Sequence, residues 1–427
     1  MAFSLGSRSA KRSALISNQE CYNHSTPVVV ACKKIGTIME SLALIEPLLP
    51  GLKDRVLIDL ATQLWVESSA LNSNLQVATI LGIGDLVRTM NCYYSNLIEG
   101  HRTHPIEIER ALAQDFSIDP RQRELQLEAK AHIEVQREID LGNAPAQVMS
   151  GEYLKWIHRE FCNRLPAEML VLTNAQSGKQ IQILPGEWRT GDVIVGRHIP
   201  ISAPAIDSFV NRFATGYRLE RLSQIERVIA VAAAHHRLVW IHPFYDGNGR
   251  VARLFSHGML RKIGIGTSLW SISRGLARSR DLYRDVLANA DLPRWNDLDG
   301  RGNLTTKGLQ AFCEFFLRTC IDQVQFMRSC LDPAQLLARI EVYLSEEIVA
   351  KRLLNGSERV VAAVFRVGEI DRGQAAAASG YQERQGRKVL QRLLATGLLV
   401  SDTPKGAVRV GFPSSLLDRY FPRLFLG

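Results

Sequence analysis

A thirteen-residue stretch, IHPFYDGNGRVAR at residues 241–253, gathers most of the side chains that could do chemistry in this sequence. Its Gly-Asn-Gly segment, residues 247–249, comes directly before an amphipathic run and is expected to begin a helix. Free N–H groups at the start of a helix bind anions, and glycine lets phosphate oxygens approach the backbone. Arg250 and Arg253 lie three residues apart, so both can contact one polyphosphate from the same side of the first turn. The stretch therefore predicts a phosphate-binding site.

Two further side chains in the stretch suit the transfer of a nucleotide. Asp246 can hold a magnesium ion that bridges phosphates, because this ion prefers one or two carboxylates together with phosphate oxygens. His242, four residues earlier, can take a proton from an attacking hydroxyl. Each residue alone is better explained by a turn or a solvated helix face, but their joint occurrence favours a nucleotidyl-transfer site. The sequence contains neither a P-loop nor the protein-kinase set of motifs.

Helices are expected to position this stretch. Ser223 and Glu226 form an S-x-x-E capping box, and apolar residues then recur at helical spacing as far as His242. A second amphipathic helix is predicted at residues 250–263, which makes the stretch a helix-loop-helix junction. Further helical blocks are predicted at residues 52–100, 105–165, 276–290 and 304–330. The predicted fold class is mainly α.

One region breaks the helical pattern. Residues 180–200 contain two β-prone runs, Ile181–Leu184 and Val193–Val195, separated by Pro-Gly and Thr-Gly-Asp turns. Short β-prone runs joined by such turns predict a β-hairpin inside an otherwise helical domain. The hairpin could serve as a flap over a binding site, and the alternative is a purely structural loop.

The stretch from His242 to Arg253 resembles the HxFx(D/E)GN(G/K)RxxR signature of Fic domain proteins and matches it at every fixed position. The similarity extends over the capped helix, the hairpin and the SRGL…Y…AD region at residues 273–291, and so covers residues 39–331. The resemblance implies a Fic-type helical domain that transfers AMP from ATP to a Ser, Thr or Tyr hydroxyl of a target protein. The Doc branch, which phosphorylates its target, has Ala and Lys where this sequence has Gly247 and Gly249, so AMP transfer is favoured.

The same resemblance implies a role for each matching residue. It makes ATP and Mg²⁺ the ligands, with a target protein or the enzyme itself as the acceptor. The implied roles are His242 as general base, Asp246 as magnesium ligand, Gly247, Asn248 and Gly249 as phosphate cradle, Arg250 and Arg253 as partners of the β- and γ-phosphates, Tyr283 beside the adenosine, and Ile194 and Val195 on a target-binding flap. Phe244 is expected to anchor the loop in the core. For Tyr283 the alternative is a core aromatic residue without a ligand.

An upstream segment, SNLIEG at residues 95–100, is unusual on local physics. Glu99 is expected in the last turn of a helix, where the negative end of the helix dipole disfavours a carboxylate. Next to the Fic signature, the segment resembles the family's inhibitory motif (S/T)xxxE(G/N). The resemblance implies that Glu99 pairs with Arg253, that Ser95 supports the pair, and that the resting enzyme is weakly active. It also leaves open a second activity, because some family members use this glutamate to remove AMP from a modified target.

The C-terminal part carries most of the net charge of +9. From Lys351 onward, thirteen Lys and Arg stand against six Asp and Glu, a net of +7. Three short helical segments followed by a hairpin-like run with a Pro-Lys-Gly turn predict a winged helix-turn-helix. The third helix carries a basic stripe whose spacing suits the phosphates or bases of DNA. Its residues are Arg384, Arg387, Lys388 and Arg392. The alternative is a dimerisation or docking module with a solvated basic face.

Length and composition suit a protein of two or three domains. The predicted division is a flexible leader at residues 1–38, an N-terminal helical region with the inhibitory motif at 39–104, a Fic catalytic domain at 105–331 and a winged-helix-like domain at 332–427. The seven cysteines are scattered without a CxxC pair, which is typical of reduced thiols in the cytoplasm. No apolar run is long enough to span a membrane, and the N-terminus lacks a secretory signal.

Other patterns that suggest metals are weak. The loop at residues 296–303 lacks the glutamate that an EF-hand needs at its twelfth position. His101 and His104 have no third ligand in view, and His235 and His236 are expected in the core or behind the site. A second function class is a DNA-binding transcriptional regulator whose Fic domain senses nucleotide, although the intact catalytic set favours chemistry. A homo-oligomer is a further open alternative.

Overall fold

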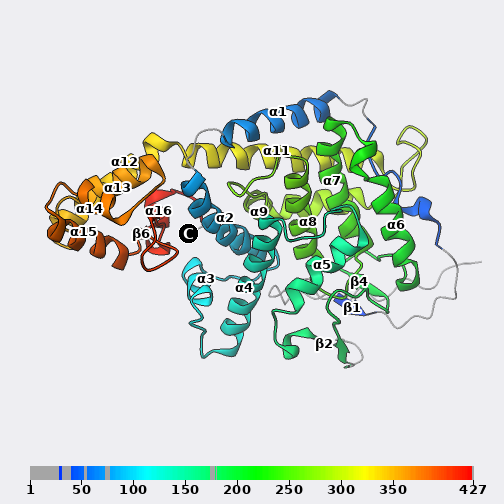
Figure 1. Ribbon diagram of the computed structural model, residues 1–427. Coiled ribbons are helices and arrows are strands. Elements are labelled where there is room, and N and C mark those ends of the chain that lie inside the picture. Colours follow the sequence, from blue (N-terminus) through cyan, green and yellow to red (C-terminus); the bar gives the residue numbers. More distant parts are fainter. Residues whose placement is uncertain are drawn as a thin grey trace, which may run out of the picture.

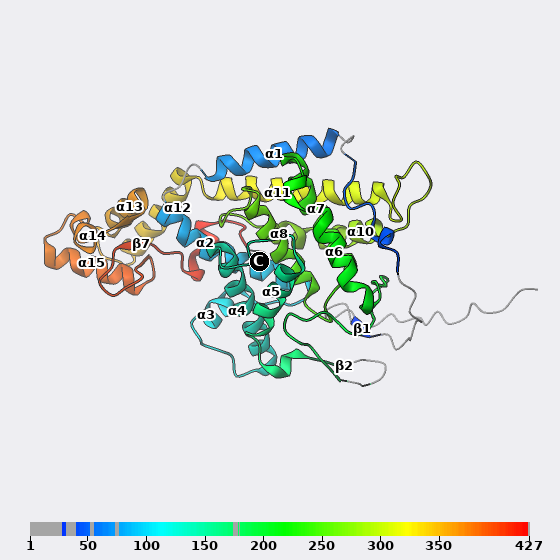
Figure 2. The same ribbon diagram turned by 45° about the vertical axis from the view of Figure 1, so that its right-hand side comes forward.

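The computed structural model describes residues 28–30, 40–51, 55–72, 77–173, 178 and 180–425, and helices dominate it (Figure 1). The helices of the larger body are α1 (Arg55–Asn72), α2 (Val77–Ile98), α3 (Pro105–Leu112), α4 (Pro120–Leu141), α5 (Gly151–Cys162), α6 (Ile206–Gly216), α7 (Gln224–Ile241), α8 (Asn248–Lys262), α9 (Ser273–Arg278), α10 (Arg280–Ala290) and α11 (Thr306–Cys330). Helix α11 packs against α7 and, on its outer side, runs alongside α1 in both views (Figures 1 and 2). The predicted mainly α fold class is confirmed.

Helix α7 forms the centre of this body because its sequence has few polar positions. The predicted capping box starts it: Glu226 N donates to Ser223 Oγ over 3.3 Å, and Ser223 N donates to Glu226 Oε2 over 2.8 Å. Nearly every side chain from Val228 to Ile241 is buried, and small alanines let neighbouring helices approach closely. The helix can therefore be covered on all sides by α6, α8 and α11.

The predicted hairpin between Ile181–Leu184 and Val193–Val195 is wrong. Strand β3 (Gln180–Gln182) instead pairs with β2 (Val171–Thr173), while β4 (Val193–Val195) pairs with β1 (Val28–Val30); both pairs are antiparallel. The reason lies in the segment between β3 and β4, where Arg189 N donates to Pro243 O over 2.9 Å and Arg189 Nε donates to His242 O over 2.8 Å. These bonds tie the segment between β3 and β4 to the α7–α8 junction.

The predicted leader, residues 1–38, lies largely outside the described residues. Its residues Val28–Val30 are described, and they form β1, in register with Val29 opposite Ile194 of β4. Elsewhere in the larger body the predicted helix at residues 276–290 is two helices, α9 and α10, which meet at Ser279. The backbone of Ser279 has φ −115° and ψ 35°, outside the helical range, and this break separates them.

A smaller module follows α11. It comprises α12 (Pro333–Val349), α13 (Ser357–Val367), β5 (Glu369–Ile370), α14 (Arg372–Ala378), α15 (Glu383–Ala395), β6 (Leu399–Val400), β7 (Val408–Val410) and α16 (Leu417–Tyr420). The three strands form an antiparallel sheet in the order β5-β7-β6. The sequence predicted the helices α13, α14 and α15 and the hairpin after them, but not β5, whose two residues are too few to give a period.

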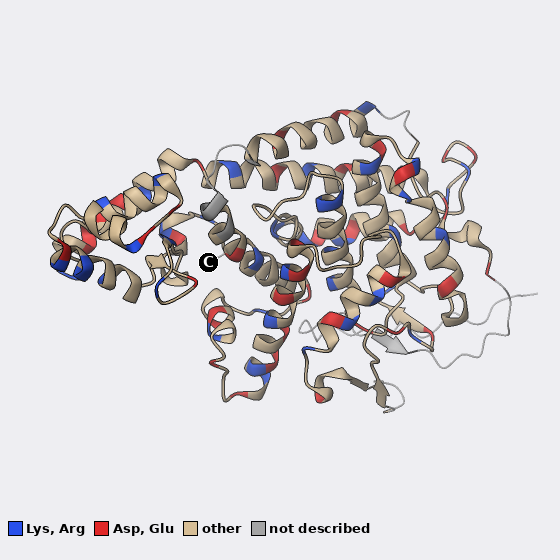
Figure 3. Cartoon of the chain, in the orientation of Figure 1, with Lys and Arg blue, Asp and Glu red and all other residues tan. Residues whose placement is uncertain are grey.

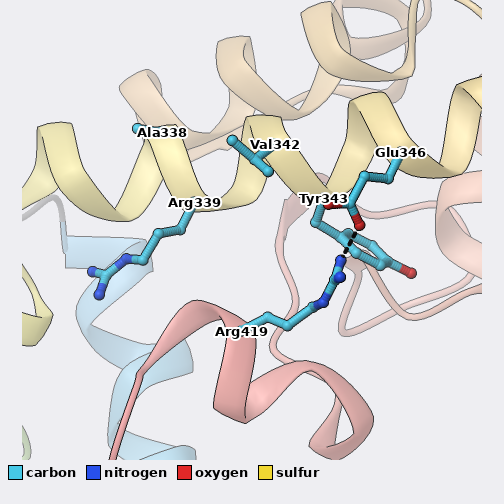
Figure 4. A pocket seen from close by; sticks show the side chains of 6 residues that line it. All are labelled: Ala338, Arg339, Val342, Tyr343, Glu346 and Arg419. Carbon is cyan, nitrogen blue, oxygen red and sulfur yellow. Dashed lines mark hydrogen bonds and ion pairs between the residues drawn. The ribbon is translucent and has the colours of Figure 1, made fainter.

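The chain returns from this module to the larger body. Within the module, Arg419 of α16 forms an ion pair with Glu346 of α12 and lies over the Tyr343 ring, beside a shallow groove (Figure 4). Beyond α16 the chain reaches α2, where Tyr94 Oη donates to Leu424 O over 2.9 Å. The C-terminus accordingly lies between the module and the larger body in Figure 1. Helix α2 thus contacts both parts of the protein.

Two predictions about the whole chain concern membranes and disulfides. No helix in the described ranges is long and apolar enough to cross a membrane. The five cysteines in those ranges are unpaired and buried, as expected for reduced thiols: Cys92, Cys162, Cys313, Cys320 and Cys330. The other two, Cys21 and Cys32, lie outside the described residues.

Candidate active site

Helix α7 ends in a turn that presents His242. This residue has φ 49° and ψ 62°, a left-handed conformation that is uncommon for a residue with a Cβ. The Arg189 guanidinium holds the turn by donating to His242 O. The His242 side chain is buried, and neither ring nitrogen has a hydrogen-bond partner within the described chain. Burial lowers the pKa of His242 to about 3, so at neutral pH the imidazole is uncharged and one ring nitrogen has a free lone pair.

Asn248 closes the loop that follows His242. Its Oδ1 accepts a hydrogen bond from Phe244 N over 3.0 Å, and its Nδ2 donates to Phe244 O over 2.8 Å. Phe244 is fully buried and stacks on His158 with ring centroids 4.0 Å apart, so it is the core anchor that the sequence predicted. Because both ends of the Asn248 amide are used inside the loop, its side chain shapes the loop. The backbone N–H groups are the main donors that a phosphate could meet here.

Helix α8 begins immediately after this loop. Its N-cap is Gly247, with φ 77°, and the N-cap supplies no side-chain hydrogen bond to the first turn. The N–H groups of that turn are therefore available to an anion, with the positive end of the helix dipole behind them. Asp246 is exposed at the same end, while Arg250 and Arg253 are only 7% and 2% exposed. The geometry suits phosphates bound at the start of α8.

The segment after α2 occupies Arg253. Glu99 lies one residue beyond the end of α2, and its Oε1 accepts a hydrogen bond from Arg253 Nη2 over 2.6 Å. Ser95, fully buried in the last turn of α2, accepts from Arg253 Nε through Oγ over 2.9 Å and from Nη2 through its carbonyl over 3.3 Å. The pairing that the resemblance implied is thus present, between residues 154 positions apart.

Glu99 also stands at the start of α8. A Cβ placed on Gly249 would clash with Glu99 Oε1, which shows how closely the carboxylate approaches the first turn. Burial alone would raise the pKa of Glu99, but Arg253 and Arg250 outweigh it and hold the pKa below its ordinary value. The residue is therefore a carboxylate at neutral pH. It sits where the helix N-terminus and Arg253 would otherwise attract a phosphate.

Glu128 is a charged residue that the sequence analysis did not single out. It lies on α4, and its Oε2 accepts a hydrogen bond from Arg250 Nη2 over 2.8 Å. His101 Nδ1 lies 3.0 Å from the same oxygen. The sequence offers no local signal for this contact, because Glu128 is one of several glutamates on a polar helix and only the packing of α4 against α8 selects it.

Tyr283 lies behind the site. Its hydroxyl is 2.7 Å from His235 Nε2, and His235 Nδ1 is 2.8 Å from Ser256 Oγ. Because Ser256 Oγ donates to Ala252 O, it accepts from His235 Nδ1, so His235 Nε2 accepts from the Tyr283 hydroxyl. His235 is thus a core residue, as expected. A nucleoside in the cleft would meet the ring of Tyr283 rather than its hydroxyl.

A cleft of about 1320 Å³ brings the predicted residues together. It is lined by Glu99, Val195, His242, Asp246, Gly247, Asn248, Gly249, Arg250, Arg253 and Tyr283. Ser95 lies behind Arg253 and Ile194 lies beside Val195 on β4; neither is among the lining residues. The volume is ample for a nucleoside triphosphate, since pockets for drug-sized ligands span roughly 300–1,000 Å³.

The carboxylates of the cleft bear on metal binding. In the described ranges no three His, Cys, Asp or Glu residues converge on one point that could hold a metal. Asp246 stands alone as an exposed carboxylate beside the start of α8. A single carboxylate fits Mg²⁺ that arrives with a polyphosphate, because that ion keeps most of its water and phosphate ligands. It does not fit a resident zinc or calcium ion.

Comparison with known proteins agrees with this geometry. Residues 149–260 match the model of the Fic/DOC family. The chain is 37% identical over 97 residues to protein adenylyltransferase Fic of Drosophila erecta, covering 23% of this chain and 20% of that protein. It is 40% identical over 79 residues to the protein of the same name from Drosophila melanogaster, covering 18% and 16%. The chain thus spans about a fifth of the length of the curated relatives it matches.

Solved structures show the same fold. Fic-1 from C. elegans superposes with a TM-score of 0.50 at 15% sequence identity, covering 65% of this chain and 73% of that one. The helical body around α7 and α8, with its short strands, is therefore a Fic fold. Residues 149–260 are thus similar to the Fic/DOC family, and the fold around them is the one seen in Fic-1.

We predict that stability falls as the pH is lowered from 7 to 5. Burial lowers the pKa of His132, His235 and His242 to about 3 and that of His158 to about 4, so these residues stay uncharged in the folded protein. In the unfolded chain they take up protons below pH 6.5. Their contribution to stability is full above pH 6.5 and is lost as the pH falls, by roughly 1.4 kcal/mol per pH unit for each histidine. Thermal unfolding midpoints at pH 7, 6 and 5 measure this, and an unchanged midpoint contradicts it.

Proposed function

We propose that this protein is an ATP- and Mg²⁺-dependent protein adenylyltransferase that transfers AMP to a hydroxyl of a target protein. The observation that carries the proposal is His242: a buried, uncharged imidazole without a hydrogen-bond partner, in the same cleft as the uncapped start of α8. A domain that only senses nucleotide needs the phosphate site but not such a base. The family of the domain and the names of its relatives support the same activity.

The reaction follows from this arrangement. The triphosphate binds at the N–H groups of the first turn of α8, with Arg250 and Arg253 neutralising its charge. Asp246 is the residue that would hold Mg²⁺ arriving with the phosphates, and the ion would supply further charge neutralisation. The target hydroxyl attacks the α-phosphorus, His242 Nε2 or Nδ1 takes its proton, and the bond to the bridging oxygen breaks to release pyrophosphate. The product is a phosphodiester between AMP and the target side chain.

Glu99 acts as a brake in this proposal. It takes Nη2 of Arg253, Ser95 takes Nε of the same residue, and the carboxylate lies against Gly249. A γ-phosphate that approached Arg253 would meet a negative charge in a partly buried site, where repulsion is poorly screened. The nucleotide can then bind in its reactive position only when Glu99 moves. The same carboxylate could also orient water toward an AMP-modified target, so hydrolysis of the modification is a second activity to be measured.

Glu99→Gly is expected to raise self-modification with labelled ATP by about tenfold or more, because Arg253 is released for phosphate. His242→Ala in the same background should lower the rate by about 10²–10⁴-fold through loss of the base. The matched control is Glu187→Gly, which removes an exposed turn carboxylate that pairs with Lys155 outside the cleft. A Glu99→Gly rate equal to that of wild type would refute the brake, and a His242→Ala rate equal to that of its Glu99→Gly parent would refute the base.

The edge of β4 is proposed as the target-binding flap. Val195 lines the cleft, and Ile194 is paired with Val29 of β1. The presence of β1 supports the idea that β4 accepts an extended segment through main-chain hydrogen bonds. It also means that a target segment on this edge would compete with β1, which belongs to the same chain.

Weakening β1 should therefore favour an external target. The triple variant Val28→Pro, Val29→Pro, Val30→Pro removes the backbone N–H donors of β1. In the Glu99→Gly background it should modify an added peptide substrate several-fold faster. The triple variant Val28→Ile, Val29→Ile, Val30→Ile keeps the donors and should behave like its parent. If the proline variant is no faster than the isoleucine variant, β1 does not compete with the target.

A second candidate function, DNA binding, rests on the C-terminal module. The order α13, β5, α14, α15, β6, β7 with the sheet order β5-β7-β6 supports a winged helix-turn-helix. The positions of the Lys and Arg residues of α15 lie at the outer end of the module in Figure 3, and these residues are exposed. Arg387 pairs with Glu383, and Arg392 donates to Arg352 O. Arg384 and Lys388 are the members of the stripe best suited to contact phosphates.

Duplex DNA should bind the full-length protein more weakly as salt rises. The double variant Arg384→Ala, Lys388→Ala should lower the affinity and reduce the slope of log K against log salt by roughly one unit per lost phosphate contact. Arg318→Ala, an exposed arginine of α11 paired with Glu314, serves as the control and should bind like wild type. If no shift occurs even at low salt, the basic stripe does not bind DNA.

A further inference from the structure

The two arginines nearest the start of α8, Arg250 and Arg253, are each paired with one glutamate, but in different geometries. Glu99 and Ser95 together take two nitrogens of Arg253, and Glu99 lies against Gly249. Glu128 takes only Nη2 of Arg250, over 2.8 Å, and comes from α4, which precedes the residues matched by the family model. Within the described chain, Nη2 is the only nitrogen of Arg250 that donates a hydrogen bond, and Nε is buried without a partner.

The surroundings fix Arg250 on two more sides. The face of its guanidinium lies over the Phe161 ring, with Cζ 5.2 Å from the ring centroid. The side chains of Arg250 and Glu128 are 8% and 15% exposed, so the pair is largely withdrawn from water and both residues line the cleft. One terminal nitrogen of the Arg250 guanidinium, Nη2, is held by Glu128, and the face of the group is packed on Phe161. The other terminal nitrogen, Nη1, is left for a ligand.

Glu128 itself is held in place. His101 Nδ1 lies 3.0 Å from the Oε2 that also accepts from Arg250, and His101 N donates to Asn96 O over 2.9 Å. Burial alone would raise the pKa of Glu128, but Arg250 and His101 outweigh it and keep the pKa below its ordinary value. The residue is thus charged in the resting protein. His101 is also only two positions from Glu99, so the segment that brakes Arg253 touches the partner of Arg250.

We propose that Glu128 is a positioning residue: it holds one arm of Arg250 so that the other arm points at the phosphates of the bound nucleotide. This inference rests on the proposed nucleotide-binding function. Glu128 differs from Glu99 because it comes from α4 and is not among the nearest atoms that a Cβ on Gly249 would meet, whereas Glu99 is. Releasing Glu99 opens the phosphate site, whereas losing Glu128 leaves a buried guanidinium without a fixed direction.

The test measures ATP binding directly, in a full-length protein that carries Glu99→Gly and His242→Ala so that no chemistry occurs. Isothermal titration with Mg²⁺-ATP should show an affinity about tenfold weaker for added Glu128→Ala. Glu128→Gln keeps an oxygen acceptor for Arg250 Nη2 and should recover part of the loss. Glu134→Gln changes a more exposed carboxylate of the same helix, paired with Lys130 and Arg164, and should bind ATP like the parent.

The outcomes separate the inference from the proposed function. If the parent does not bind Mg²⁺-ATP, the nucleotide-binding function fails and this inference fails with it. If the parent binds and Glu128→Ala binds equally well or more tightly, only the role of Glu128 is wrong, and a tighter complex makes Glu128 a second competitor of phosphate. If Glu128→Ala weakens binding but also lowers the unfolding midpoint, recovery of affinity in Glu128→Gln decides for positioning, and equal loss in both variants decides against it.

Discussion

The burial of two arginines beside the start of one helix is the constraint on which this site depends. Arg250 and Arg253 lie in the first turns of α8 and are 7% and 2% exposed. A buried guanidinium without a counter-charge costs several kcal/mol, so a fold that keeps these residues for phosphate must neutralise them while phosphate is absent. Glu128 and Glu99 provide the two charges. The positions of α2 and α4 follow from this need, because each places one of the carboxylates against α8.

Under the proposed function, the same constraint predicts that the resting cleft attracts a polyphosphate weakly. Two guanidinium groups and two carboxylates form an alternating cluster with no net charge, and the start of α8 has Glu99 before it. A nucleotide gains the full attraction only by displacing a carboxylate. Exchanging one anion for another near the same arginine changes the free energy only a little. A small structural change can therefore shift the balance between the carboxylate and the phosphate.

Residues that act through local sequence were predictable, and residues selected by packing were not. The loop from His242 to Arg253 is held by short-range contacts such as the Asn248–Phe244 pair, so the motif alone was enough to predict the shape of the loop. The pairing of Glu99 with Arg253 was expected only through a family resemblance, since nothing local links the two positions. Glu128 had no such signal, because its partner is set by the crossing of α4 and α8.

The strand pairing was predicted wrongly for a related reason. A run of three residues specifies an extended conformation but does not specify its partner, and the pairing of β4 is decided by how Arg189 ties the preceding segment to Pro243 and His242. Period and turn signals therefore placed the run Val193–Val195 correctly, ended the other run two residues beyond the observed strand Gln180–Gln182, and paired the two runs wrongly. Tyr283 shows the same limit for a side chain, because its hydroxyl is directed inward by His235, which comes from another helix.

Helix α2 joins the cleft to the C-terminal module. One turn before its end, Tyr94 donates to Leu424 O over 2.9 Å, and the Tyr93 ring lies edge-on to Phe425 at 5.4 Å. Ser95, which follows Tyr94 in α2, accepts a hydrogen bond from Arg253 Nε through its hydroxyl. A helix of 22 residues is a stiff element about 33 Å long. The contacts of Tyr94 and of Ser95 therefore cannot move independently of each other. The C-terminal tail and the Arg253 side chain thus contact adjacent positions of one helix, Tyr94 and Ser95.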